Sequence, residues 1–254
     1  MGGTVPVPLR GSVADSPPML LPPIQRARRA FYNAGGPYLR ARVFERLGSE
    51  RFSRPALFEM DARLEALLPP GPGVFVEAGA HDGYTQSNTY FLERRRGWSG
   101  VLVEAVPELA ERARRRRPRS QVVQAALVGP GAPPTVSIRF GDLMSTLGDA
   151  GHAAGGLANA GRDPYTVEVP ARTLSDILDE AGVARVDLLV LDVEGHELDA
   201  LRGLDLDRHA PGLLLVEMLD MAAQRPAFDA LLEGRYAWVD ALTPYDGLYA
   251  LTGT

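Results

Sequence analysis

The amino-acid sequence predicts an α/β protein with a doubly wound, mostly parallel, Rossmann-like sheet. Residues 74–76 form a short apolar run that stops at Glu77, and residues 100–104 form a second run that ends on Glu104. Short apolar runs of this kind are typical of parallel strands that are buried on both faces. Beyond them, strand-like and helix-like segments alternate along the chain, which is the pattern of a parallel sheet connected by crossover helices.

The composition is that of a globular protein and excludes several kinds of chemistry. Of the 254 residues, 45% are hydrophobic and 23% charged, and the net charge of -5 gives no reason to expect nucleic acid as a partner. Cysteine is absent and every basic residue is Arg, so cysteine and Schiff-base lysine chemistry are both excluded. No apolar run approaches the ~20 residues that a membrane helix needs, and the first residues lack the pattern of a secretory signal. We therefore expect a cytoplasmic protein without a membrane partner.

The N-terminal part, residues 1–70, is expected to be an extension of a domain that occupies residues 71–254. Residues 1–23 are rich in Pro and are expected to be extended or disordered, whereas residues 24–47 have helical composition. Ser53 is expected to cap a further helix. The apolar residues on one face of that helix are Leu57, Met60, Leu64, Leu67 and Leu68. This helical front is expected to cover the substrate cleft, to form a homodimer contact or to pack on the sheet edge.

A glycine turn follows the first strand. Gly79 and Gly83 permit a tight turn that brings backbone amides close to a ligand, and residues 87–93 then have helix-compatible composition. Strand, glycine turn and helix in this order open a nucleotide-binding sheet. The spacing differs from the Gly-x-Gly-x-x-Gly fingerprint of dinucleotide-binding proteins, and the alternative is that the glycines only bend the chain.

Glu104 stands at the tip of the second strand, where folds of this kind hold a ribose, because a carboxylate accepts hydrogen bonds from both vicinal hydroxyls. The alternative is a surface acid that merely ends the strand. The next residues, 107–117, are expected to form a helix. Their basic run is interpreted as a solvated helix face rather than a nucleic-acid site, and it comprises Arg112, Arg114, Arg115, Arg116, Arg117 and Arg119.

The rest of the chain continues the alternation of strands and helices. Residues 121–128 are expected to form the third strand, with Ala125 small enough to lie beside an adenine ring. Residues 135–140 and 165–169 alternate like strands and are expected to pair as a hairpin. Thr173 is expected to cap the next helix. The remaining expected helices are 174–181, 197–204 and 227–233, and the remaining strands are 186–191, 212–217, 236–242 and 248–251, the last two as an antiparallel pair.

A long loop connects the two strands of the first hairpin. We expect Asp142 and Ser145 to face the adenine or the substrate, and residues 148–163, which are rich in Gly and Ala, to form a mobile flap. The alternative is a surface insertion without a role.

Three motifs follow one another in a characteristic order: Val-Glu-Ala-Gly-Ala-His-Asp-Gly-Tyr-Thr-Gln-Ser-Asn-Thr-Tyr-Phe-Leu-Glu at 76–93, Gly-Trp-Ser-Gly at 97–100 and Leu-Asp-Val-Glu-Gly-His-Glu at 191–197. Together they resemble the FkbM-type methyltransferases, class I enzymes that use S-adenosylmethionine (SAM). The resemblance extends over residues 71–252. It departs from the family pattern at His81, where Asn is expected, and before the first strand, where Ser-Arg-Pro at 53–55 replaces the usual Ser-Gln piece.

The resemblance implies a SAM-dependent O-methyltransferase that acts on a hydroxyl of a sugar or of a secondary metabolite such as a macrolide. The turn amides would suit the carboxylate of SAM, Glu104 its ribose, and nearby acids its positive charges, all at the carboxyl edge of the sheet. The expected cofactor contacts are Glu77, Gly79, Ala80, His81, Asp82, Gly83, Thr85, Ser87, Asn88, Glu104, Ala105, Ala125, Asp142, Ser145 and Asp192.

Two arrangements are expected to be able to handle the proton of the acceptor hydroxyl. In the first, the imidazole of His196 accepts it at neutral pH, with Asp192 and Glu194 beside it; the alternative is that His196 only caps a helix. In the second, Asp192 and Glu217 hold a divalent ion, as in catechol-type methyltransferases, with Glu194 as a possible third ligand. An all-oxygen site favours Mg²⁺. His81, in the cofactor turn, is expected to contact SAM or the substrate, and His152 and His209 are expected to be loop or surface residues.

Two other functions remain open at this stage. One is an NAD-dependent oxidoreductase on a similar sheet, which the glycine spacing and the absence of a Tyr-x-x-x-Lys pair disfavour. The other is a non-catalytic SAM-binding protein, which the retained Asp-Val-Glu-Gly-His-Glu motif disfavours.

Overall fold

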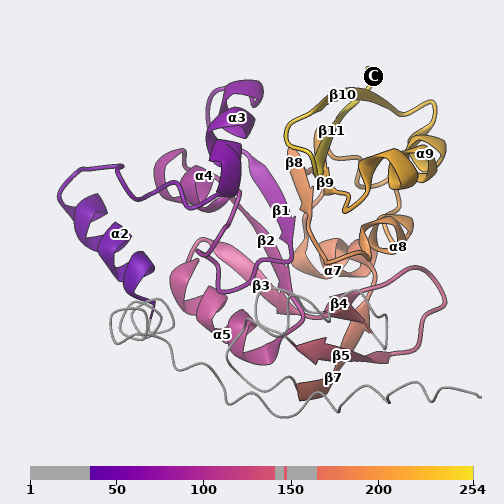
Figure 1. The fold of residues 1–254 in the computed structure, drawn as a ribbon, viewed down its shortest axis with the longest axis horizontal. Helices are drawn as coiled ribbons and strands as arrows, with labels where there is room; N and C mark the ends of the chain where they lie inside the picture. Colours follow the sequence, from indigo (N-terminus) through magenta and orange to yellow (C-terminus); the bar gives the residue numbers. More distant parts are fainter. Residues whose placement is uncertain (1–34, 141–145, 148–164, 254) are drawn as a thin grey trace, which may run out of the picture.

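The computed structural model describes residues 35–140, 146–147 and 165–253. Seven strands form one sheet in the order β10-β11-β9-β8-β1-β2-β3 (Figure 1). Their bounds are β1 (Val74–Ala78), β2 (Ser99–Glu104), β3 (Ser120–Gln124), β8 (Leu188–Leu191), β9 (Leu213–Glu217), β10 (Tyr236–Ala241) and β11 (Asp246–Leu251). The pairs from β3 to β9 are parallel, and β11 is antiparallel to both of its neighbours. The predicted doubly wound sheet with a terminal antiparallel hairpin is confirmed.

The strand order reverses beside β1. The chain runs outward from β1 through β2 to β3 and then returns to place β8 on the other side of β1. At the carboxyl end, Ala78 lies opposite Val103 of β2 and Leu191 of β8. Ligands of open α/β sheets bind outside the carboxyl ends of the strands at such a reversal, so this edge is the place to examine for a site.

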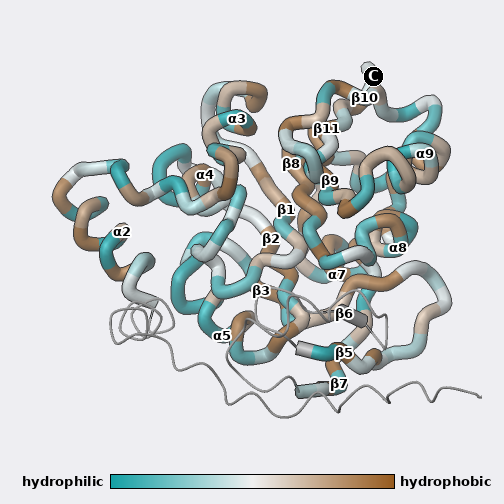
Figure 2. Tube along the Cα trace, in the orientation of Figure 1, coloured by the Kyte–Doolittle hydropathy of each residue, from teal (hydrophilic) through white to brown (hydrophobic). Residues whose placement is uncertain are grey.

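Helices cover both faces of the sheet. One group comprises α3 (Met60–Leu67), α4 (Tyr90–Arg95) and α5 (Pro107–Arg116), and the other comprises α7 (Leu174–Ala181), α8 (Glu197–Arg202) and α9 (Met221–Leu232). In Figure 1 the first group lies to the left of the central strands and the second to the right. Successive side chains of β1 alternate between the two cores, since Phe75 packs with the first group and Val76 with the second. The central strands are therefore apolar on both faces, as the brown β1 and β8 in Figure 2 show.

A second, smaller sheet begins where β3 ends. Its strands are β4 (Ala126–Leu127), β5 (Thr135–Phe140), β6 (Thr146–Leu147) and β7 (Tyr165–Arg172), in the order β4-β7-β5-β6. The antiparallel pairing of β5 with β7 confirms the predicted hairpin. The single strand predicted over residues 121–128 is wrong, because the chain passes from one sheet to the other at Ala125. β3 pairs with β2, whereas β4 pairs with β7.

The N-terminal helix α2 (Gly36–Arg46) packs against the segment that follows the glycine turn. Tyr38 and Ala41 of α2 form a small core with Tyr84 and Tyr90, and the three Tyr rings meet edge to face. The Tyr90 hydroxyl also donates to the buried Glu45 carboxylate at 3.0 Å. α2 is thereby attached to the same part of the chain that follows β1.

The segment between α2 and α3 differs from the prediction. Ser53 does not cap a helix, because its hydroxyl donates to Glu45 across 3.0 Å, and α3 begins only after the short 3-10 turn η1 (Leu57–Glu59). Phe58 within that turn has a positive φ of 52°, which breaks the helical periodicity. Of the apolar face predicted for this helix, Met60 and Leu64 are buried, but Leu57 and Leu67 are 51% and 48% exposed.

Within the described parts of the chain, the longest apolar helices are too short or too polar to cross a bilayer.

Candidate functional site

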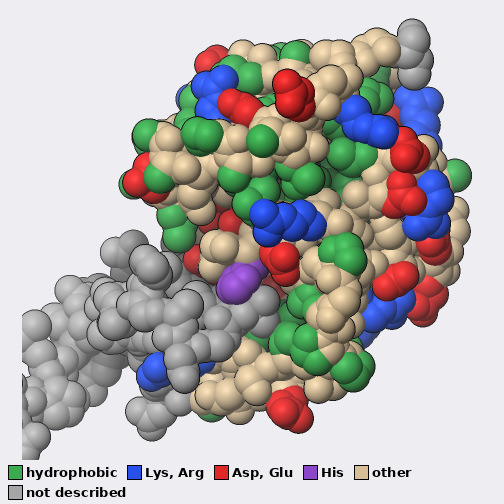
Figure 3. Space-filling model, turned by 90° about the vertical axis from the view of Figure 1, so that its right-hand side faces the viewer, with side chains coloured by type: hydrophobic (Ala, Val, Ile, Leu, Met, Phe, Trp, Pro, Cys, Tyr) green, Lys and Arg blue, Asp and Glu red, His purple; other side chains and the backbone are tan. Residues whose placement is uncertain are grey.

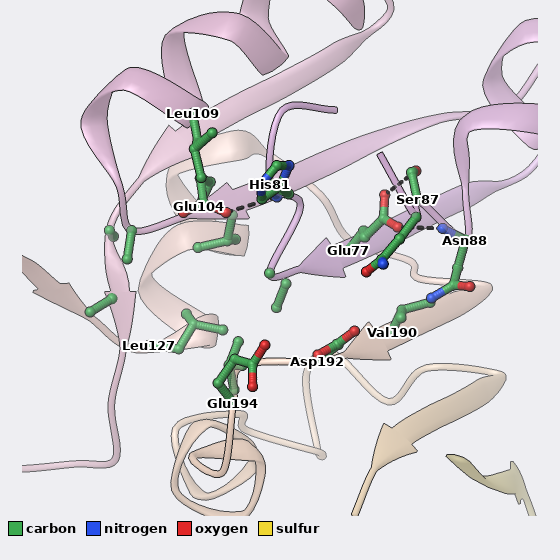
Figure 4. Close-up of a pocket in the computed structure, with 18 of the residues that line it drawn as sticks. Glu77, His81, Ser87, Asn88, Glu104, Leu109, Leu127, Val190, Asp192 and Glu194 are labelled. Carbon is green, nitrogen blue, oxygen red and sulfur yellow. Dashed lines mark hydrogen bonds between the residues drawn. The ribbon is translucent and has the colours of Figure 1, made fainter. Parts of the chain in front are cut away.

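A cavity lies at the carboxyl edge of the sheet, where β1 meets β2 and β8 (Figure 4). It is lined by Glu77, Ala78, Gly79, His81, Thr85, Gln86, Ser87, Asn88, Val103, Glu104, Ala105, Leu109, Ala125, Ala126, Leu127, Val190, Asp192, Val193 and Glu194. The structure therefore brings together most of the residues that were predicted from the motifs. The predicted Ala80, Asp82 and Gly83 belong to the turn but do not line the cavity, and Asp142 and Ser145 lie outside the described residues.

Sequence reasoning missed one wall of the cavity. Leu109 of α5 and Ala126 and Leu127 of β4 line it together with Ala125. This wall is apolar and is made by small or aliphatic side chains, as the placement of Leu109 and Leu127 in Figure 4 shows. The only signal for it in the sequence was the small size of Ala125, because the approach of α5 and β4 is a tertiary contact.

Gly79 brings the end of β1 against the residue that follows β8. Its φ is +82°, and a Cβ atom added there would lie 1.7 Å from the carbonyl oxygen of Asp192. No side chain fits at that distance, so a glycine is required for the end of β1 to touch the end of β8. The contact forms the floor of the cavity.

The backbone amides of the turn have partners within the protein. Gly79 and Ala80 both donate to the carbonyl of Val103, at 3.0 and 3.1 Å, and His81 donates to the Glu104 carboxylate at 2.7 Å. His81 adopts a positive φ of 47°, a conformation that a residue with a side chain rarely takes. The turn is thus folded onto the end of β2, and the three amides expected to bind a cofactor carboxylate hold the turn itself.

Glu104 is a buried carboxylate at the tip of β2. One oxygen accepts from the amide of His81 and the other from the amide of Val106 at 2.8 Å. The side chain is 7% exposed, and burial raises its pKa to about 7, although the hydrogen bond from Val106 acts in the opposite direction. Each carboxylate oxygen can accept a second hydrogen bond, so Glu104 retains acceptors for a ligand in the cavity.

Glu77 fixes the segment after the turn rather than pointing free into the cavity. It accepts from the Ser87 hydroxyl at 2.9 Å, the Asn88 amide at 2.7 Å and the Thr89 hydroxyl at 2.6 Å. The first two of these contacts are drawn in Figure 4. Because these residues are bound to β1, the helix predicted over residues 87–93 begins only at Tyr90, whose amide donates to the Ser87 hydroxyl.

Two residues of the basic run are part of this structure and not solvated, which corrects the interpretation of the run as an exposed face. Arg116 pairs with the buried carboxylate of Asp82, which itself accepts from the amides of Tyr84 and Thr85. Burial alone would raise the pKa of Asp82, but His81 and the Arg116 guanidinium hold it well below its usual range. Arg117 is fully buried.

Carboxyl groups gather on the β8 side of the cavity. Asp192 directly follows β8, and Glu217 is the last residue of the neighbouring β9. Glu194, with a positive φ of 56°, lines the cavity beside Asp192. Burial, followed by repulsion from Asp192, raises the pKa of Glu194 to about 8. Burial likewise raises the pKa of Glu217 to about 7, and burial and Glu217 raise that of Asp192 well above its usual range. Burial and mutual repulsion thus disfavour the charged form of all three carboxyls.

A metal site is not evident in the described ranges. They contain no group of three or more His, Asp or Glu placed to hold an ion. Glu217, one of the two predicted ligands, does not line the cavity. The loop that carries Asp192 is instead ordered by Glu197, whose carboxylate accepts from the amides of Val193 and Gly195 at 2.9 Å each.

The histidines differ in their surroundings. His196 stands directly before α8, makes no side-chain cap hydrogen bond there and does not line the cavity; burial lowers its pKa, with Asp199 acting in the opposite direction. His209, predicted to be a loop or surface residue, lies in a loop, where it is 5% exposed and its Nε2 lies 2.9 Å from Asp179. His152 lies outside the described residues. In the view of Figure 3, a histidine side chain lies at the edge of a hollow, beside acidic side chains.

The fold and this cavity define a doubly wound α/β protein with a cavity at the reversal of strand order. A family model described as the methyltransferase FkbM domain matches residues 77–233. That match covers more than half of the chain, and the chain belongs to the FkbM methyltransferase domain family.

Two curated proteins share part of this sequence. Methyltransferase 1 of Beauveria bassiana is 38% identical over 82 residues, which cover 31% of this chain and 32% of that protein. Methyltransferase sdnD of Sordaria araneosa is 37% identical over 78 residues, which cover 27% and 30% of the two chains. The chain thus spans about a third of the length of the curated relatives it matches.

Solved structures with a similar course of the chain are more distant in sequence. A TehB-like SAM-dependent methyltransferase from Corynebacterium glutamicum has a TM-score of 0.44 and 11% identity, covering 87% of this chain and 99% of that one. The SAH-bound methyltransferase PaMTH1 of Podospora anserina has a TM-score of 0.43 and 12% identity, covering 94% and 100%. Similarity at this level does not distinguish one activity from another.

Proposed function

We propose that the protein is a SAM-dependent O-methyltransferase whose acceptor is a hydroxyl of a sugar or of a secondary metabolite such as a macrolide. The observation that carries the proposal is the cavity at the reversal of strand order, with Glu104 at the tip of β2 and the glycine turn after β1. Membership of the FkbM methyltransferase domain family and the methyltransferase names of the curated relatives support it.

The residues that line the cavity fit the parts of SAM. Glu104 would accept from the ribose hydroxyls through the acceptors that His81 and Val106 leave open. The wall made by Leu109, Ala125 and Leu127 is apolar and suits a flat adenine ring. Asp192 and Glu194 lie on the side where the cationic groups of SAM would bind, and a cation placed there would favour release of their protons and the charged carboxylate form.

When bound, SAM supplies an electrophilic methyl group, and the protein must align the acceptor and receive its proton. Asp192 and Glu194 line the cavity and can take up that proton or orient the acceptor hydroxyl. His196, a few residues further along the same loop, can relay it to solvent or accept it directly, because its lowered pKa keeps the imidazole neutral. A Mg²⁺ ion held by Asp192 and Glu217 is the competing arrangement, and a chelator distinguishes the two.

Calorimetry with SAM, S-adenosylhomocysteine (SAH) and NAD tests the cofactor. We expect binding of SAM and SAH and none of NAD. Glu104→Ala should weaken SAH binding by ~1.5–3 kcal/mol, the usual cost of losing hydrogen bonds to a charged group, or roughly 10- to 150-fold in affinity. The matched control is Glu111→Ala, an exposed acid of α5 whose ion-pair partners among the described residues are Arg114 and Arg115, and it should leave SAH affinity unchanged.

Three outcomes would contradict the proposal or one of its parts. Binding of NAD without SAM would assign the cavity to an oxidoreductase. Unchanged SAH affinity in a folded Glu104→Ala protein would remove the ribose role of Glu104. Binding of SAH without methyl transfer to any hydroxyl acceptor in a screen of sugars and macrolides would leave a SAM-binding protein of another role.

A further inference from the structure

We propose that Arg117 is the positioning residue of the turn that would hold the cofactor, and this inference rests on the proposed function. Arg117 directly follows α5, in the basic run whose other members are mostly exposed. Its side chain is completely buried. A guanidinium is always charged in proteins and is costly to remove from water, so its burial here calls for a specific role.

The guanidinium contacts the end of β1, the turn after it and the helix α4 that follows. Nη1 donates to the Ser87 hydroxyl at 3.1 Å and to the Gly83 carbonyl at 3.3 Å. Nη2 donates to the Thr89 hydroxyl at 2.9 Å, and Nε to the carboxylate of Glu93 in α4 at 2.7 Å. A further contact of 3.4 Å reaches Glu77 at the end of β1. One side chain thus binds a strand end, a turn and a helix.

These contacts specify a conformation more than they add stability. Buried ion pairs can often be replaced by apolar residues without loss of stability, so a buried pair is a weak argument for stabilisation alone. The planar fork of an Arg side chain, in contrast, fixes the direction of each of its acceptors. In this molecule those acceptors set the path of the chain from Gly83 to Thr89, which includes the positive φ of Gln86.

The ordered segment forms one wall of the cavity. Of the partners of Arg117, Glu77 and Ser87 line the cavity directly, and Thr85, Gln86 and Asn88 between the anchored residues line it as well. Arg117 itself does not line it. Arg117 therefore acts on a ligand only through the residues that it holds, which defines it as a positioning residue.

The test is Arg117→Lys, which keeps the positive charge and loses the planar fork. We expect SAH affinity by calorimetry to fall roughly tenfold or more and amide hydrogen exchange of residues 83–90 to become faster, while exchange in β9 and β11 stays at the wild-type level. Arg115→Ala is the control within the same basic run, because Arg115 is exposed and, within the part of the chain that the structure describes, forms an ion pair with Glu111 alone. It should leave both affinity and exchange unchanged.

A second control separates positioning from general stability. Leu232→Ala removes a buried side chain of α9 far from the turn and should lower the melting temperature without changing SAH affinity. If Arg117→Lys behaves like Leu232→Ala, with a lower melting temperature and wild-type affinity, Arg117 is only structural and the inference fails. If Arg117→Lys does not fold, Thr89→Val removes the Nη2 acceptor together with the hydroxyl that donates to Glu77 and should weaken SAH binding in the same direction; wild-type affinity in that variant would also overturn the inference.

The two proposals fail in different ways. If the wild-type protein binds neither SAM nor SAH, the proposed function fails, and hydrogen exchange without ligand still tests Arg117. Faster exchange confined to residues 83–90 in Arg117→Lys would then sustain the positioning role, whereas a uniform increase over the whole sheet would refute it.

Discussion

Gly79 shows how one residue determines whether the cavity forms. Its neighbour across the floor is the carbonyl oxygen of Asp192, so even a methyl group would collide with the backbone of β8. We expect Gly79→Ala to lower the free energy of unfolding by clearly more than the ~1–2 kcal/mol that a left-handed conformation alone costs a residue with a side chain. Chemical denaturation of the purified variant measures this difference.

Gly131→Ala is the matched control for that substitution. Gly131 has nearly the same φ, +81°, but no atom lies within 4 Å of its added Cβ. Gly131→Ala should therefore lose only the free energy of unfolding that the left-handed conformation costs, because its methyl group meets no other atom. Equal losses in the two variants would mean that the chain around Gly79 relaxes easily, and the floor would not be rigid.

His196 is the residue through which the two arrangements for the acceptor proton can be separated. If its imidazole receives the proton, His196→Ala should lower turnover by ~10²–10⁴ and leave SAH affinity nearly unchanged, because His196 does not line the cavity. Activity should rise with pH through a value below the ordinary 6.5 of imidazole, since burial lowers the pKa of His196. Rates with the acceptor, measured over a pH series, provide the readout.

Removal of divalent metal ions with EDTA tests the alternative, in which a metal ion handles the acceptor proton. Loss of activity with EDTA and recovery with Mg²⁺ would assign the role to a metal held by Asp192 and Glu217, and Asp192→Asn should then behave like metal removal. A fully active, folded His196→Ala enzyme would rule out the histidine.

Much of the site could be predicted residue by residue, and the failures share a physical cause. Gly79, Glu104 and Asp192 were identifiable because each stands at a strand end, which the local pattern fixes. Arg117 was not, because its burial depends on Glu77 and Glu93, which are distant in the sequence. A run of Arg residues has the same local appearance whether its last member is solvated or buried.

At the scale of elements, α7 offers the most direct test of a predicted cap. Thr173 was expected to cap it, and its hydroxyl does accept from the amide of Asp176 at 3.1 Å. Thr173→Ala should lower the free energy of unfolding by ~1 kcal/mol, the usual cost of losing such a cap. Thr173→Ser keeps the hydroxyl and should stay within a few tenths of the wild type; equal loss in both variants would assign the effect to packing of the Thr methyl group.

Elements with a local signal were predicted well, and those decided by partners were not. The hairpin of β5 with β7 and the helix α5 follow from alternation and composition, and both are present. The segment 121–128 has one continuous strand-like pattern, yet its two halves pair with different sheets. The choice of pairing partner lies outside the segment, so no pattern within it could reveal the division.

At the scale of the whole molecule, the buried carboxyls make stability depend on pH. The pKa values of Glu104 and Glu217 are raised to about 7 and that of Glu194 to about 8. Above the ordinary value of 4.5, the native state retains protons that the unfolded chain has released, so the free energy of unfolding falls as pH rises. The lowered pKa of His196 makes the free energy of unfolding rise with pH, but only up to about pH 6.5, the ordinary pKa of imidazole. The fall in the free energy of unfolding should therefore be clearest between pH 6.5 and about pH 8.

Denaturant unfolding at several pH values checks this expectation. Glu194→Gln removes one of the titrating groups with little change in shape, and we expect it to flatten the slope by roughly 1 kcal/mol over that interval. A wild-type stability that rises from pH 6.5 to 8 would show that the carboxyls are solvated in the native state.

The passage of the chain from β3 to β4 at Ala125 has a consequence for inhibitor design. The floor of the cavity belongs to the large sheet and is locked by the contact between Gly79 and Asp192, whereas Leu127 on the opposite wall belongs to the small sheet. The last strand of the large sheet, β3, is joined to the first strand of the small sheet, β4, by Ala125 alone, and Ala125 itself lines the cavity. The hydrogen bonds that hold Leu127 are those of the small sheet, and the hydrogen bonds that hold the Glu104 side are those of the large one. A compound that fills this cavity therefore contacts both sheets at once, and substitutions that loosen either sheet should weaken its binding.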